Sequence, residues 1–112
     1  MNSEESLVRE FAKLHHYWVQ TASQVLTDKT ADLIAFENEE GIRRLQAVIT
    51  DGGCEVEVQD FIAQITSGLI HSILAGFDGS GELKQNSGVS LVDAQGQPLV
   101  EYLHELWPEY YR

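Results

Sequence analysis

The chain has 112 residues, of which 43% are hydrophobic, and a formal net charge of −11, which predicts a single acidic domain, residues 1–112, with enough apolar side chains for a core. Eighteen acidic residues against seven basic ones leave no basic stripe for a phosphate backbone, so we expect no binding to nucleic acid or to an anionic membrane. Cys54 is the single cysteine, which excludes an internal disulfide, and the first residues lack a secretion signal, so we expect a cytoplasmic protein.

The first expected element is a long amphipathic helix. Ser3 or Ser6 can cap its start, since short hydroxyl side chains satisfy the unpaired N–H groups of a first turn. Apolar residues then recur with the helical period at Leu7, Phe11, Leu14, Trp18 and Val25. Residues 27–28 are expected to end this helix and to cap the next one.

Residues 28–51 allow two interpretations. They form one helix kinked near Gly41 or two short helices, and a short strand at 32–36 is the less favoured alternative. Asp51-Gly52-Gly53 is a clear stop, because glycine adopts the left-handed conformation that ends a helix.

The next expected helix covers residues 58–77 and is apolar around much of its circumference. Such a helix is typical of a central position, packed on several sides. Glycine and serine then indicate a loop over residues 78–88.

Residues 89–93 alternate and predict a short strand. It could pair with residues near 82–85, with residues 97–100, or across a dimer. Pro98 suits the first position of the last helix, and Pro108 should end or bend that helix. The expected fold is therefore α+β, mostly α, with three to four helices and a short strand or hairpin before the C-terminal helix.

Two histidines and two carboxylates are the candidate chemical groups. His71 and Asp78 are seven residues apart on the expected helix, which places them about 10 Å apart along its axis. His71 therefore needs a partner from the last helix, where His104 and Glu105 lie. A hydrogen-bonded clamp between the two helices is favoured over a catalytic or metal site of two histidines and one carboxylate, so no metal and no cofactor are expected.

The C-terminal segment is rich in aromatic and acidic residues. Tyrosine and tryptophan are enriched at the centres of protein interfaces, and acidic neighbours suit a basic partner. The residues predicted to bind a partner are Glu105, Trp107, Glu109, Tyr110 and Tyr111. The alternative is that Tyr102 and Trp107 close the core while the final tyrosines are packed or frayed.

Three segments carry a family resemblance. Residues 71–79 follow the pattern H-S-x-L-x-x-x-D-G, residues 91–99 follow L-x-D-x-x-G-x-x-L, and residues 103–105 read L-H-E. This order resembles small bacterial proteins of uncharacterised families, domains of unknown function that include immunity-like proteins. The resemblance implies no catalytic residue, but it suggests that His71, Asp78 and His104 belong together.

These observations favour a non-enzymatic bacterial protein that acts through protein contacts. An immunity or antitoxin-like acidic binding protein is its most concrete form, because the chain is small and acidic, its C-terminal segment is aromatic and acidic, and it lacks a nucleophile or metal motif. The alternatives are a small metal-dependent enzyme centred on His71, Asp78, His104 and Glu105, and a structural homo-oligomer. A homodimer is expected on size alone, because a short chain buries a limited share of its surface.

Overall fold

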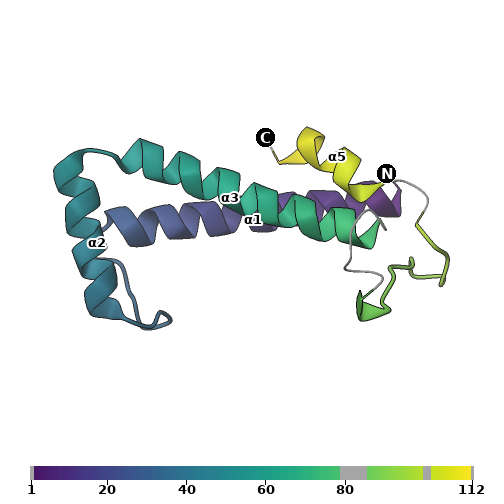
Figure 1. Ribbon diagram of the computed structural model, residues 1–112, viewed down its shortest axis with the longest axis horizontal. Helices are drawn as coiled ribbons and strands as arrows, with labels where there is room; N and C mark the ends of the chain where they lie inside the picture. Colours follow the sequence, from purple (N-terminus) through teal and green to yellow (C-terminus); the bar gives the residue numbers. More distant parts are fainter. Residues whose placement is uncertain (1, 79–85, 100–101, 112) are drawn as a thin grey trace. The chain divides into compact units, whose positions relative to one another are not determined.

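The computed structural model describes residues 2–78, 86–99 and 102–111. These ranges hold four long or medium helices, namely α1 (Ser3–Thr27), α2 (Glu39–Gly52), α3 (Glu55–Phe77) and α5 (Leu103–Tyr110) (Figure 1). Among the described residues, no helix combines the length and the apolar character that crossing a bilayer requires. The predicted loop over residues 78–88 and one proposed strand partner, residues 82–85, fall largely on residues 79–85, which lie outside the described ranges.

The first predicted helix is confirmed as α1, but its cap is different. The side chain of Asn2 accepts the Glu5 backbone N–H at 2.8 Å, so Asn2 provides the capping oxygen that we expected from Ser3 or Ser6. At the other end α1 stops at Thr27. The Asp28 side chain then accepts hydrogen bonds from the Thr30 backbone and hydroxyl and starts a turn, as short acidic side chains commonly do.

Both interpretations of residues 28–51 are wrong at the N-terminal end, because residues 28–38 form turns and α2 is one helix. Asn38 caps α2 in the left-handed conformation, with φ of 57°, and accepts the Gly41 N–H at 3.1 Å. A β-carbon on Gly41 would collide with this Asn38 side chain, so Gly41 permits a tight cap and no kink. The predicted stop is confirmed, since Gly53 ends α2 with φ of 63°.

The predicted α+β class is wrong, because residues 86–99 and 102–111 form no strand or sheet. Val92 and Pro98 make one isolated antiparallel bridge. Between them the Asp93 carboxylate accepts the backbone N–H groups of Gln95 and Gln97, which turns the chain back at once. Pro98 has no N–H to extend a ladder. The last helix accordingly starts at Leu103 instead of Pro98, and Pro108 lies inside it.

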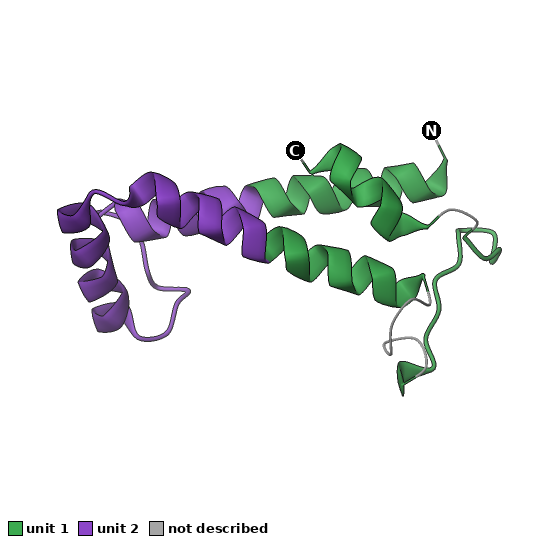
Figure 2. Ribbon diagram, turned by 45° about the horizontal axis from the view of Figure 1, so that its top comes forward, with its two compact units in different colours: residues 1–16, 66–112 green, residues 17–65 purple. Residues whose placement is uncertain are grey.

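The chain forms two compact units, shown in different colours in Figure 2. Unit 1 contains residues 1–16 and 66–112, and unit 2 contains residues 17–65. The core of unit 1 joins the first part of α1, the second part of α3, and α5. Its buried residues are Val8, Ile70, Leu74, Leu103 and Trp107. The single domain expected from chain length stays a prediction.

Unit 2 has a much smaller core. It combines the second part of α1, the turns of residues 28–38, α2 and the first part of α3. Its buried side chains are Val19, Leu33, Gln46 and Ile49. One of these four is the polar amide of Gln46, which needs hydrogen-bond partners because it is buried.

Candidate functional site

Asp78 and His104 form the closest contact among the residues singled out from the sequence. Oδ2 of Asp78 lies 2.6 Å from Nδ1 of His104, and the Asp78 side chain is only 5% exposed. The backbone N–H groups of Leu103 and His104 also donate to this carboxylate, at 3.0 and 2.9 Å. An ionised carboxylate only accepts hydrogen bonds, so Nδ1 of His104 carries the proton in this pair.

This geometry makes Asp78 the N-terminal cap of α5, supplied from 25 residues earlier in the chain. Tyr102 occupies the cap position of α5 and makes no side-chain cap bond. The first-turn N–H groups of a helix need an acceptor, and negative charge there is favoured by the helix dipole. A carboxylate at the end of α3 meets both needs and joins α3 to α5.

His71 and Glu105 are placed differently from the other two candidates. The His71 ring packs edge-to-face against the His104 ring, with centroids 5.6 Å apart, but His71 is exposed and its contact is with a ring and not with Asp78. Glu105 is exposed on α5. Within the described ranges, no three His, Cys, Asp or Glu side chains are grouped closely enough to hold a metal ion.

The predicted partner-binding residues separate into buried and exposed ones. Trp107 is only 1% exposed, and its indole N–H donates to Ser67 Oγ at 3.0 Å, so it belongs to the core. Tyr111 stacks on Trp107 with centroids 5.1 Å apart, and both rings make T-shaped contacts with the His15 ring. The expectation that Tyr102 and Trp107 close the core is therefore right for Trp107 and wrong for Tyr102, which is 56% exposed. Glu105 and Glu109 are exposed.

Tyr110 and Tyr111 line a surface groove of about 500 Å³ in unit 1. The opposite wall of this groove is α1, which contributes Arg9, Lys13 and His16. The Arg9 guanidinium lies 5.9 Å from the centre of the Tyr110 ring, within the range of a cation–π contact. The side chains beside these tyrosines are thus basic, whereas the sequence pattern pointed to an acidic surface.

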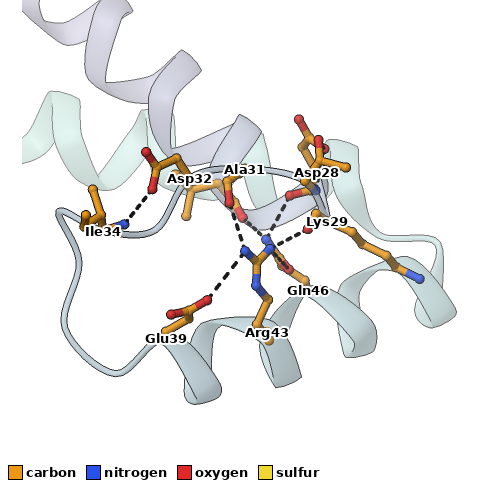
Figure 3. Close-up of polar contacts among 10 residues, drawn as sticks. Asp28, Lys29, Ala31, Asp32, Ile34, Glu39, Arg43 and Gln46 are labelled. Atoms are coloured by element: carbon orange, nitrogen blue, oxygen red, sulfur yellow. Dashed lines mark hydrogen bonds and ion pairs between the residues drawn. The ribbon is translucent and has the colours of Figure 1, made fainter.

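Unit 2 holds a polar cluster that the sequence analysis missed (Figure 3). Nη1 of Arg43 donates to the carbonyl of Lys29 at 2.6 Å, and Nη2 donates to the carbonyl of Ala31 at 2.9 Å. The buried Gln46 amide donates to the carbonyls of Val25 and Asp28. Arg43 and Gln46 thereby bind the last carbonyls of α1 and the turn after it to α2.

The same cluster perturbs one carboxyl group. The Thr30 hydroxyl and then the Thr30 backbone N–H, both bonded to Asp28, lower the pKa of the Asp28 carboxyl below its ordinary value, and the Arg43 charge adds to this effect. Hydrogen bonds to the charged form favour that form. Asp28 therefore stays ionised under mildly acidic conditions and keeps the turn after α1 closed.

The surface of unit 2 is unusually apolar. Within residues 17–65, three large apolar side chains are buried, at Val19, Leu33 and Ile49, whereas nine are exposed. The exposed ones are Tyr17, Trp18, Ile34, Phe36, Leu45, Val48, Val56, Phe61 and Ile65. The helical period of the sequence could not predict this exposure. It shows which helix faces are apolar, but not whether a neighbouring element covers them.

Searches against protein-family models, curated proteins and solved structures find no match for this chain, so the resemblance to immunity-like bacterial families stays a hypothesis.

Proposed function

We propose that this protein acts by protein–protein contact, as an acidic binding protein of the immunity or antitoxin kind. The observation that carries the proposal is the apolar surface of unit 2. Phe61 is 64% exposed and Ile65 is 60% exposed, although they lie one helical turn apart on the same side of α3. Monomeric proteins rarely leave groups of large apolar side chains open to water unless a partner covers them.

The charge of unit 2 indicates the kind of partner. Residues 17–65 contain nine acidic and three basic residues, and Arg43, one of the three, is bound to backbone carbonyls. Exposed apolar side chains on an acidic unit suit a partner that carries an apolar patch together with basic residues. The negative charge of unit 2 would also accelerate association with such a partner.

Site-specific photo-crosslinking tests this proposal. A photoreactive phenylalanine analogue at position 61, expressed in the source cells, should form a covalent adduct with a basic protein that mass spectrometry identifies. The matched control is position 59, because Gln59 is also exposed on α3 but lies about 200° around the helix from residue 61. The identified partner is then purified, and the Phe61→Gln variant should bind it at least about tenfold more weakly, the cost of losing one buried aromatic ring.

Three outcomes would count against this proposal. Equal adducts from positions 59 and 61 would mean nonspecific contact, and no adduct at either position would mean that the apolar surface has no protein partner. An adduct between two copies of this chain would replace the proposal with the homodimer or structural homo-oligomer.

A histidine-based or metal-dependent enzyme is the second candidate. It is supported by the Asp78–His104 hydrogen bond and the packing of the His71 ring against His104, since a carboxylate on Nδ1 orients the other ring nitrogen of a histidine for proton transfer or metal binding. Native mass spectrometry after incubation with zinc tests it. If no metal is retained, and His71→Ala changes only the free energy of unfolding, the enzyme candidate is excluded.

A further inference from the structure

The groove between α1 and α5 in unit 1 concentrates positive charge in an acidic protein. Arg9, Lys13 and His16 follow one another at spacings of four and three residues, which places them on one face of α1. Two of the seven Lys and Arg residues of the chain therefore face this groove together with one histidine. Ala12 also lines the groove and adds a small apolar side chain to it.

The wall of the groove that faces Arg9 and Lys13 is aromatic, and its rings are fixed by contacts with the core. Tyr111 stacks on Trp107 at an interplanar angle of 19°, and Trp107 is anchored in the core by its hydrogen bond to Ser67. Tyr110 takes the Arg9 guanidinium over its ring. The groove thus offers a flat apolar surface on one side and cations on the other, and its shape does not depend on long side chains alone.

The cations of this groove are poorly neutralised. Within the described part of the chain, Arg9 forms no ion pair with a carboxylate, and its guanidinium lies over the Tyr110 ring. Lys13 pairs with Glu10 at 3.0 Å, but both side chains are about two-thirds exposed. A pair so exposed to water is weak and is readily exchanged for another carboxylate.

We propose that this groove binds a carboxylate carried on an aromatic or apolar body. Arg9 and Lys13 would hold the carboxylate, since a guanidinium matches its two oxygens, and the tyrosine rings would pack against the body. A volume of about 500 Å³ is within the usual range of small-ligand sites. A single negative charge fits better than a polyanion, because the surrounding protein carries a net charge of −11 and repels multiple charges.

A titration monitored by ¹H–¹⁵N NMR, with 3-phenylpropionate as the probe, tests this proposal. Amide signals of Arg9, Lys13, His16, Tyr110 and Tyr111 should shift together with a dissociation constant in the millimolar range or tighter, typical for a ligand of this size. The neutral 3-phenylpropionamide, which has the same body, should bind about tenfold more weakly. A phenylalanine-ending peptide with a free or an amidated C-terminus then shows whether the site also accepts a peptide carboxylate.

Two substitutions with opposite expected signs sharpen the test. Arg9→Gln should weaken binding of 3-phenylpropionate about tenfold, whereas Glu10→Gln should strengthen it about threefold, because it removes the carboxylate that competes for Lys13. Arg44→Gln, at an exposed position on α2, is the matched control and should change nothing. Circular dichroism confirms that each variant is folded.

The proposal is overturned if 3-phenylpropionate at about 20 mM, which exceeds a dissociation constant of a few millimolar, shifts none of these signals. It is also overturned if the amide analogue binds equally well, or if Arg9→Gln and Arg44→Gln behave alike. These outcomes leave the proposed protein contact of unit 2 untouched, because none of the groove residues belongs to residues 17–65.

Discussion

Replacing Asp78 should destabilise the protein far more than replacing an ordinary surface acid. The Asp78 carboxylate accepts three hydrogen bonds, two from the first turn of α5 and one from the His104 ring. A hydrogen bond to a charged group contributes about 1.5–3 kcal/mol, and losing a helix cap costs about 0.5–2 kcal/mol. Because the three bonds share one carboxylate and are not additive, we expect Asp78→Ala to lower the free energy of unfolding by about 3 kcal/mol, out of the roughly 5–15 kcal/mol of a typical domain.

Urea denaturation followed by tryptophan fluorescence measures this effect. The chain has two tryptophans, so a Trp18→Phe background leaves only Trp107, which is buried in the unit 1 core beside α5. Asp78→Asn should cost about half as much as Asp78→Ala, because the amide oxygen can still accept one N–H. His104→Ala should fall between the two, since it removes the ring contact and leaves both backbone bonds in place.

Asp60→Ala is the matched control for this series. Asp60 is exposed on α3 and accepts one hydrogen bond from the Gln64 side chain, four residues away, and such surface changes usually alter stability by about 0.5 kcal/mol or less. If Asp78→Ala is no more destabilising than Asp60→Ala, then Asp78 does not cap α5 and the link between α3 and α5 is wrong.

Three further predictions concern buried or perturbed polar groups. Gln46→Leu should lower the free energy of unfolding by about 2–3 kcal/mol in urea denaturation, because two backbone carbonyls lose their donor. Ser67→Ala should cost about 1–2 kcal/mol and should alter the near-ultraviolet circular dichroism of Trp107, because the buried indole N–H loses its acceptor. Thr30→Val should raise the pKa of Asp28, as measured by an NMR titration of its carboxyl carbon, because the hydroxyl bond that lowers this pKa is gone.

Exposed residues of α3 provide matched controls for the first two of these substitutions. Gln59→Leu and Ser72→Ala make the same changes at exposed positions of α3, and neither should move the unfolding midpoint. The pKa of Asp28 is lowered in the folded state, so its bonds stabilise the protein above the pKa of the unfolded state, and this stabilisation is lost as the pH falls through the folded-state pKa. If Thr30→Val still lowered the free energy of unfolding at a pH well below the pKa of Asp28, the stabilisation would not come from the ionised Asp28 carboxylate, and this interpretation would be wrong.

Local signals in the sequence were enough to predict α1, α3 and the glycine stop after α2, but not the start of α2 or of α5. The apolar residues of α1 and α3 recur with the helical period over many turns, and Gly53 takes the left-handed conformation that few other residues tolerate. These features depend on neighbours in the chain. The same reasoning failed for residues 89–93, because a strand needs a partner, and Pro98 cannot donate to one.

Only part of the candidate site could be predicted from the sequence. Spacing excluded a direct bond between His71 and Asp78 and directed attention to the last helix, where Asp78 does meet His104. The cap on α5 could not be foreseen, because a helix start normally takes its cap from the preceding residue. The composition of the C-terminal segment likewise could not show that Tyr110 faces Arg9.

The amino-acid sequence by itself determined that this protein is acidic and mainly helical, because charge is a sum over residues and helix formation is a local, periodic property. Only the tertiary structure decided that Asp78 caps α5, that the C-terminal tyrosines face basic side chains, and that unit 2 leaves most of its large apolar side chains exposed. Each of these depends on which groups distant in the chain come into contact, and hydrogen bonds, ion pairs and burial act through distance in space.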